Sequence, residues 1–330
     1  MNRRSLIAAA AAGLALPLMP RPLRAESLPQ GLTEPQVFAA FDPAAADCRP
    51  PADLARRLVF ARDNDRDFID GVDHGLALAA ADRGLAYETV NAGGDAARMV
   101  AQLDALQDQG LGALVIAPVD AGRAAPALLQ MLAAGTYVGA IVPPPATTIL
   151  NAPQYLTGKV LGDAAVSYIR DRFEGRAHVV LLTHDSLEFL APRFAAMRDC
   201  LRALPEVEIV ADISPLTVDE QGGFDTMTTI LMAEPQIDVV LGADTVVLGA
   251  LAAMRAAGQA RTDQFFGGID GEPAAVAELQ TPGSPYKASV SLASSVFGYA
   301  MGQQAADWIE GKSIPKAIDV LPALLTPQSL

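Results

Sequence analysis

Short apolar runs alternate with longer amphipathic segments from residue 57 onward. The short runs are apolar throughout, whereas apolar residues recur at helical spacing in the longer segments. Continuous apolar strands separated by helices are typical of a parallel sheet that is covered on both faces. In the first half the pattern predicts strands at 58–61, 85–90 and 113–117 and helices at 68–83, 95–109 and 124–134.

The same alternation begins again in the second half of the chain. It predicts helices at 156–173, 191–204, 222–233, 245–258 and 297–310, and strands at 178–183, 208–213 and 239–242. A chain of 330 residues exceeds the usual size of a single hydrophobic core. The repetition of βαβ units therefore predicts an α/β protein with two Rossmann-like lobes, each a parallel sheet with helices on both faces.

Three short motifs in the last third of the chain point to a ligand site. They read Ala243-Asp244-Thr245-Val246-Val247-Leu248-Gly249-Ala250, Gly268-Ile269-Asp270-Gly271 and Ala288-Ser289-Val290. The first two place an aspartate in the polar loop that follows an apolar strand. Open α/β sheets bind small molecules at this end of their strands.

In order and spacing, these motifs resemble "ND-x-x-A-x-G-A", "G-x-D-G" and "A-T-I" of the type I periplasmic solute-binding proteins, in the sugar-binding, ribose-binding-like branch of ABC-transporter receptors. The resemblance covers about residues 57–330. It implies two lobes joined by a three-segment hinge and closing around one small solute. The implied organisation is an N-terminal lobe of 57–156 plus 293–320 and a C-terminal lobe of 157–292 plus 321–330.

In the first lobe, the resemblance implies ligand contacts in the loop 63–68, from the polar Asp65 and the aromatic Phe68, which would stack on the ligand. Alternatively, Phe68 begins the core face of its helix. The Asp-x-Asp-x-Asp spacing of this loop is similar to a calcium loop. Phe68 and His74, however, stand where that loop needs glycine and a bidentate glutamate, so we expect no metal site.

In the second lobe, Arg193 matches the arginine with which the family holds ligand hydroxyls, a role suited to a rigid five-donor fork. A helix-surface ion pair is the alternative. The resemblance also brings His184, Asp185 and Phe189 of the preceding loop into the implied site. His184 could serve as a general base. The chain has only two other histidines and no nucleophile motif, so we expect a pocket donor or a solvated loop residue.

Two further aspartates complete the implied site. Asp270 matches the ligand-binding aspartate of "G-x-D-G", and a carboxylate can accept hydrogen bonds from two hydroxyls. The alternative is stabilisation of its own turn. Asp244 either binds the ligand or caps the helix that it opens.

The chain departs from the sugar-binding pattern at three places. Val142-Pro143 replaces an Asp-Arg pair, Ala243 replaces an asparagine and Leu292 replaces a hinge glutamine. Polar ligand atoms buried without partners cost about 1–3 kcal/mol each. A less polar relative of a sugar or polyol therefore becomes a plausible ligand.

The first 25 residues have the pattern of a secretory signal. Arg3-Arg4 precedes an apolar run at 8–19, and Ala25 is a small residue suited to cleavage. The arginine pair predicts the twin-arginine route, with the general route as the alternative. The apolar run is short and followed closely by prolines, so we expect a soluble periplasmic protein without a membrane anchor.

Residues 26–56 have no sustained period and predict an irregular extension. This extension contains Cys48, and the other cysteine of the chain, Cys200, lies in a predicted helix. An oxidising compartment would permit a disulfide between them. Two unpaired thiols are an equally open alternative, because the sequence does not give the distance between the two cysteines.

The chain has 24 basic and 38 acidic side chains and a net charge of −14, which disfavours nucleic acid as a partner. It contains no phosphate loop, metal-ligand cluster or catalytic triad motif, so we expect neither an enzyme nor a cofactor. The function expected is a monomeric receptor that captures a small molecule for an inner-membrane ABC permease. The alternatives are a ligand sensor for a sensor kinase or chemoreceptor and, more remotely, an exported enzyme.

Overall fold

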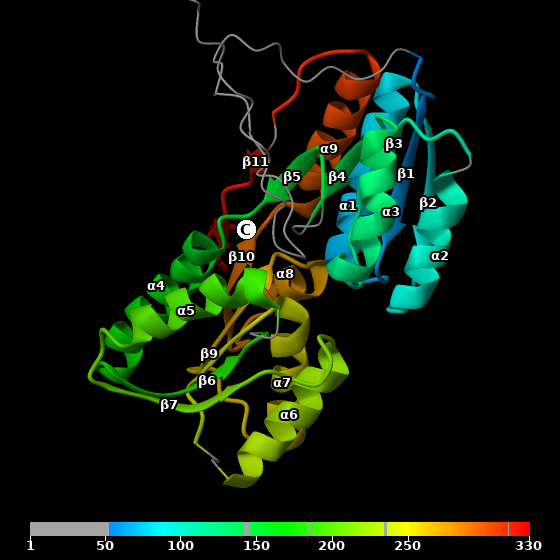
Figure 1. The fold of residues 1–330 in the computed structure, drawn as a ribbon. Helices are drawn as coiled ribbons and strands as arrows, with labels where there is room; N and C mark the ends of the chain where they lie inside the picture. Colours follow the sequence, from blue (N-terminus) through cyan, green and yellow to red (C-terminus); the bar gives the residue numbers. More distant parts are fainter. Residues whose placement is uncertain (1–52, 108, 142–144, 185–186, 234–235, 316) are drawn as a thin grey trace, which may run out of the picture. The chain divides into compact units, whose positions relative to one another are not determined.

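The computed structural model describes residues 53–330 apart from 108, 142–144, 185–186, 234–235 and 316 (Figure 1). The predicted signal at 1–25 and most of the extension at 26–56, with Cys48, lie outside the described residues. Within the part that is described, no helix is long and apolar enough to cross a membrane.

The first sheet has six strands in the order β11-β5-β4-β3-β1-β2, and every adjacent pair is parallel. Its strands are β1 (Arg57–Arg62), β2 (Ala86–Asn91), β3 (Ala113–Ile116), β4 (Tyr137–Ala140), β5 (Thr148–Asn151) and β11 (Ala317–Asp319). Its helices are α1 (Asp67–Arg83), α2 (Ala96–Gln107), α3 (Ala121–Ala133) and α9 (Ser294–Ile309).

Alternation within β1 explains how helices cover both faces of this sheet. Leu58 and Phe60 pack with α1 and α9, which lie side by side (Figure 1). Val59 and Ala61 point to the opposite face and pack with α2 and α3. Both sets are fully buried, so the strand is apolar throughout.

The second sheet has the order β12-β10-β9-β8-β6-β7 and is parallel except for β12, which runs antiparallel to β10. Its strands are β6 (Arg176–Leu182), β7 (Glu206–Ile213), β8 (Val239–Leu241), β9 (Phe265–Asp270), β10 (Tyr286–Ser291) and β12 (Ala323–Leu325). Its helices are α4 (Gln154–Phe173), α5 (Ala191–Leu201), α6 (Glu220–Ala233), α7 (Asp244–Ala256) and α8 (Pro273–Gln280), and the short 3-10 helix η1 (Glu188–Leu190) precedes α5.

The predicted α/β architecture of two Rossmann-like lobes is confirmed. On the second sheet α4 and α5 pack over one face and α6 and α7 over the other. The chain passes from one sheet to the other three times, between β5 and α4, between β10 and α9, and between β11 and β12. The antiparallel edge strand β12 is a departure from the purely parallel sheets that we expected. The residue bounds of the lobes given above stay a prediction.

Helix boundaries follow local chemistry. Gly84 has φ of 62° and ends α1 in the left-handed conformation that glycine adopts at little cost. Helix α5 ends at Leu201, earlier than the predicted residue 204, and Pro205 disfavours helical geometry in the residue before it.

Trp308 in α9 is buried in the core of the first lobe and donates from Nε1 to the Gly135 carbonyl at 2.9 Å, which confirms the expected core position.

Candidate functional site

An arginine and an aspartate meet at the carboxyl end of the second sheet. Arg193 lies in the first turn of α5, and Asp270 is the last residue of β9. Nη1 of Arg193 is 3.8 Å from Oδ1 of Asp270. Nε of Arg193 donates to Oε1 of Gln154, the first residue of α4, at 2.9 Å. The structure thus brings together two of the residues predicted for the ligand site.

Arg193 is buried and Asp270 is largely buried, with 15% of its side chain exposed, and this sets the electrostatics of the pair. Arg193 is only 7% exposed. Burial raises the pKa of Asp270, and the Arg193 guanidinium opposes that rise. Burial also lowers the pKa of Arg193, and the Asp270 carboxylate opposes that decrease. The guanidinium nevertheless stays charged at any physiological pH. At 3.8 Å the two groups attract without a hydrogen bond between these atoms, so donors and acceptors remain for a polyhydroxylated molecule.

The backbone at Asp270 is strained. Its φ of 121° lies where side-chain-bearing residues are rare, and Gly271 follows with φ of 71°. The Gly271 N–H donates to Oγ of Ser289 in the neighbouring strand β10 at 3.2 Å. Such strain costs about 1–3 kcal/mol and is found most often at functional sites.

Asp244 is fully buried behind this pair. Its carboxylate accepts hydrogen bonds from Tyr286 Oη at 2.7 Å, Ser289 Oγ at 2.7 Å and the Glu272 N–H at 2.9 Å. The helix-capping alternative is wrong, because Ala243 occupies the cap position and Asp244 bonds to other elements. The Asp244 side chain is 0% exposed and bonds to neighbouring elements, which is a supporting role. Contact of Asp244 with a ligand stays a prediction.

Glu272 was missed in the sequence, although it stands two residues after Asp270. It occupies the cap position of α8 and is 6% exposed. Burial, followed by the Asp270 and Asp244 carboxylates, raises the pKa of Glu272 to about 8. Burial, followed by Asp270, raises the pKa of Asp244 to about 6. A glutamic acid that stays protonated near neutral pH can donate a hydrogen bond, which an ionised carboxylate cannot do. The signal available in the sequence was an acidic residue directly after "G-x-D-G", which could have marked Glu272 as a site residue.

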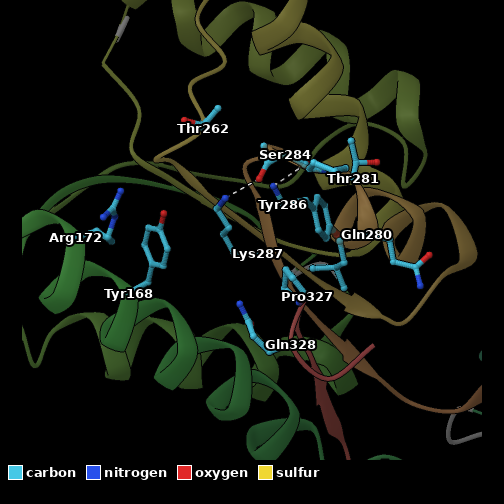
Figure 2. A pocket seen from close by; sticks show the side chains of 13 residues that line it. Tyr168, Arg172, Thr262, Gln280, Thr281, Ser284, Tyr286, Lys287, Pro327 and Gln328 are labelled. Carbon is cyan, nitrogen blue, oxygen red and sulfur yellow. Dashed lines mark hydrogen bonds between the residues drawn. The ribbon is translucent and has the colours of Figure 1, made fainter.

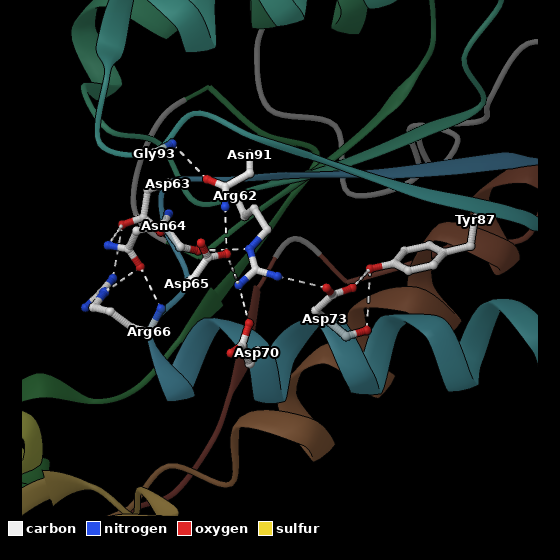
Figure 3. Close-up of polar contacts among 10 residues, drawn as sticks. All are labelled: Arg62, Asp63, Asn64, Asp65, Arg66, Asp70, Asp73, Tyr87, Asn91 and Gly93. Carbon is white, nitrogen blue, oxygen red and sulfur yellow. Dashed lines mark hydrogen bonds and ion pairs between the residues drawn. The ribbon is translucent and has the colours of Figure 1, made fainter.

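In the first lobe, Arg62 organises the loop after β1 (Figure 3). It is buried and donates to the Asn64 carbonyl at 2.9 Å, to Asp73 Oδ2 at 3.0 Å and to Asp70. It also pairs with Asp65 at 3.1 Å. Arg62 was not a predicted site residue, because nothing in the sequence shows that a strand-end arginine will face two partners in the following loop and two in α1.

Asp65 keeps most of its side chain in solvent while two neighbours hold it. Besides Arg62, Asn91 Nδ2 donates to its Oδ1 at 2.7 Å, and its side chain is 77% exposed. In the same loop Arg66 pairs with Asp63 at 3.1 Å. Arginines therefore neutralise Asp63 and Asp65, two of the three acids whose spacing is similar to a calcium loop. Across the described part of the chain, no cluster of three or more metal-ligating side chains is found.

Phe68 is the second residue of α1 and is half-buried. Its ring meets that of Phe297 in α9 edge-on, with centroids 5.8 Å apart. This contact supports the core alternative, and stacking on a ligand stays a prediction.

The remaining predicted residues lie between β6 and α5. His184 and Phe189 are both half-buried, and Phe189 belongs to η1, directly before the helix that carries Arg193. Asp185 lies outside the described residues. The contacts that these residues make with a ligand stay predictions.

Two of the departures from the sugar-binding pattern can be placed. Leu292 is buried in the core of the second lobe, and Ala243 is half-buried at the start of α7. Neither side chain offers a hydrogen bond. Val142-Pro143 lies outside the described residues.

Cys200 is a free thiol in the described part of the chain, and its Sγ lies 3.4 Å from Oδ1 of Asp163. Burial, followed by the bond to Asp163, raises the pKa of the thiol to about 11, which disfavours the reactive thiolate. Pairing with Cys48 stays a prediction, because Cys48 lies outside the described residues.

The fold is that of the type I periplasmic binding proteins. The sequence profile of the periplasmic binding protein domain matches residues 58–317, and the chain belongs to this family. A D-apiose import binding protein of Actinobacillus succinogenes is 34% identical over 109 residues, which are 33% of this chain and 34% of that protein. The match therefore spans about a third of that relative's length.

Solved structures show the same fold at low sequence identity. An ABC transporter periplasmic solute-binding protein of A. succinogenes with bound D-allose has a TM-score of 0.74 and 17% identity, over 83% of this chain and 98% of that one. A 5-methylthioribose transporter solute-binding protein of Thermotoga lettingae, in complex with 5-methylthioribose, has a TM-score of 0.72 and 22% identity, over 83% and 87% of the two chains.

Proposed function

We propose that this protein captures a small polyhydroxylated molecule in the periplasm, a sugar, a polyol or a less polar relative, and delivers it to an ABC permease in the inner membrane. The buried Arg193–Asp270 pair is the observation that carries the proposal. Its two charged groups lie 3.8 Å apart at the carboxyl end of a parallel sheet, where α/β proteins bind ligands. Membership of the family and the import function named for a relative support it.

The proposed chemistry is binding alone. Arg193 donates to ligand oxygens, the Asp270 carboxylate accepts from ligand hydroxyls, and Glu272 adds a donor when it is protonated. Contacts from the loop 63–68, including Asp65 and Phe68, hold the ligand from the first lobe. Contacts from both lobes stabilise a closed state, with the three crossing segments as the hinge. No bond is made or broken.

The ligand is proposed to be less polar than a typical hexose. Ala243 and Leu292 supply no hydrogen bond where sugar-binding relatives carry amide side chains, so fewer hydroxyls can be satisfied. The T. lettingae relative is in complex with a pentose that carries a methylthio group, and this class of molecule is a fitting first candidate.

Export by the twin-arginine signal at 1–25, a soluble monomer and the permease as partner belong to the same proposal. The short apolar run of the leader supports removal of the signal over anchoring. We propose no catalytic activity, which agrees with the binding role in the names of the relatives.

The test is a thermal-shift screen of the purified protein against sugars, polyols and methylthiopentoses, followed by calorimetry. A ligand of the folded state must raise the melting temperature. Arg193→Gln and Asp270→Asn are each expected to weaken binding about tenfold or more, because each removes a charge-assisted bond. The matched control is Arg202→Gln, at the other end of α5, where Arg202 is exposed and pairs with Asp199.

The outcome that contradicts the proposal is a ligand whose affinity both variants leave unchanged. Mass spectrometry of the ligand after incubation checks the absence of catalysis, because a bound molecule must be recovered intact.

A further inference from the structure

A separate cavity of about 600 Å³ lies in the second lobe, at the other end of the sheet from Arg193 and Asp270 (Figure 2). Tyr286, the first residue of β10, forms part of its wall, whereas Asp270 is the last residue of the adjacent parallel strand β9. The end of α4, the loop before β10 and Pro327-Gln328 complete the wall. The volume falls in the range of small-molecule sites.

The charged side chains that line this cavity are both cations. Arg172 reaches it from α4 and Lys287 from β10, and no carboxylate lines it. This is unusual in a chain with a net charge of −14. Figure 2 shows the two side chains on either side of the Tyr168 ring.

The Asp263 carboxylate attracts Lys287, but no acidic side chain forms a close contact with either cation in the described part of the chain. No ion pair of Arg172 or Lys287 is found there, and Lys287 Nζ donates to the Ser284 carbonyl at 2.6 Å, which uses one of its three hydrogens. The nearby Asp263 is engaged by Arg261 at 3.2 Å. Burial, followed by repulsion from Arg172, lowers the pKa of Lys287. An anion between the two cations would relieve that repulsion.

The rest of the wall suits a small organic anion. Thr262, Gln280 and Gln328 offer polar groups, while Leu279, Pro282 and Pro327 are apolar. A bare phosphate would fill only a small part of about 600 Å³.

We propose that this cavity is a second binding site, which takes a small molecule with at least two negative charges on phosphate or carboxylate groups, held between Arg172 and Lys287. The site is independent of the Arg193–Asp270 site and takes a different class of ligand. A guanidinium binds such oxyanions through paired hydrogen bonds, and an ammonium adds a compact charge.

Calorimetry at constant ionic strength tests the proposal, with citrate, glucose 6-phosphate and inorganic phosphate as probes and sorbitol as a neutral comparison. Citrate or glucose 6-phosphate is expected to bind the wild-type protein. Arg172→Gln together with Lys287→Gln is expected to weaken that binding about tenfold or more. The stronger of the two organic probes identifies the preferred anionic group, and sorbitol binding should not change in the double variant.

The matched control is Arg170→Gln. Arg170 is exposed on the same helix, two residues from Arg172, and does not line the cavity. Its variant is expected to keep the wild-type affinity within about twofold, as is Arg193→Gln, because both leave the proposed pair intact. Because Arg172 is itself exposed, the single variant Arg172→Gln should fold normally. It replaces the double variant in the binding test if the double variant does not fold.

Three results would overturn the second site. The first is that none of the three anions binds the wild-type protein. The second is equal affinity in the wild-type protein and the cavity variants. The third is an equal loss in Arg170→Gln or Arg193→Gln, which would assign the effect to general surface charge or to the other site. None of these results bears on whether a neutral ligand binds at Arg193 and Asp270.

Discussion

The phenolic oxygen of Tyr286 lies 2.7 Å from Oδ1 of Asp244, so the first residue of β10 is bonded to the first residue of α7. Both residues are buried, and Ser289 and the Glu272 N–H donate to the same carboxylate. Asp244 thus connects a strand, a helix and the loop after β9 that carries Asp270. We infer that it maintains the shape of the proposed ligand site.

Removal of this carboxylate should be costly. Asp244→Ala leaves three buried donors without an acceptor, so we expect the free energy of unfolding to fall by about 3 kcal/mol or more. Tyr286→Phe removes one hydrogen bond and should cost about 1 kcal/mol. Urea denaturation measures both, with Asp171→Ala on the exposed side of α4 as the control. Equal losses in Asp244→Ala and Tyr286→Phe would contradict the network.

The Arg193–Asp270 pair should behave as a coupled unit. Arg193→Met leaves a buried carboxylate without its cation, and we expect the free energy of unfolding to fall by about 3 kcal/mol. Asp270→Asn added to Arg193→Met should restore part of that stability, because it removes the unpaired charge. A double-mutant cycle by chemical denaturation measures the coupling. Additive effects on stability would show that the two side chains do not interact. The double variant is still expected to lose binding of the neutral ligand, because both side chains proposed to contact it are changed.

Glu272 predicts a pH dependence of stability. Its pKa is about 8 in the folded protein against 4.5 for the free side chain, so the folded state binds more protons between these values. Stability from this group is therefore fully present below about pH 4.5 and is lost as the pH rises through about 8. Glu272→Gln should remove this loss. The measurement compares urea midpoints of the two proteins from pH 5 to 9, and parallel curves would contradict the raised pKa.

Close packing of α4 on α5 positions Arg193. A Cβ at Gly158 would lie 1.8 Å from the Arg193 carbonyl oxygen, so Gly158→Ala must push the helices apart. We expect a loss of about 1–3 kcal/mol in stability together with weaker ligand binding. Gly122→Ala in α3 is the control, because its nearest neighbour is 3.4 Å away and alanine favours a helix. Thermal unfolding and calorimetry follow both effects, and similar behaviour of the two variants would argue against this role.

Periodicity predicted most of the elements of both lobes, because burial of a strand on both faces leaves a continuous apolar run in the chain. It gave no range for β4, β5, α8 or the edge strands β11 and β12, and these four strands have only three or four residues each. Such short segments carry no measurable period. Local chemistry predicted the end of α1, where Gly84 takes a conformation that costs other residues more.

The residues of the proposed site were partly predictable. Arg193 and Asp270 follow from motif positions, and the structure places them together. Glu272 and Arg62 were missed, because their environments depend on loops that fold against other elements. Asp244 was expected to bind the ligand or cap its helix. It does not cap the helix, since the donors that bind its carboxylate come from β10 and from the loop before α8, and its contact with a ligand stays a prediction.

The sequence by itself determined the α/β class, the two lobes and the positions of the polar loops, because helical and strand periods and turn residues act over a few neighbouring positions. Only the tertiary structure decided which polar groups meet. Tyr286 and Asp244 are 42 residues apart and touch because β10, β9 and β8 lie side by side. Strand order and register set such contacts, and with them the burial that shifts each pKa.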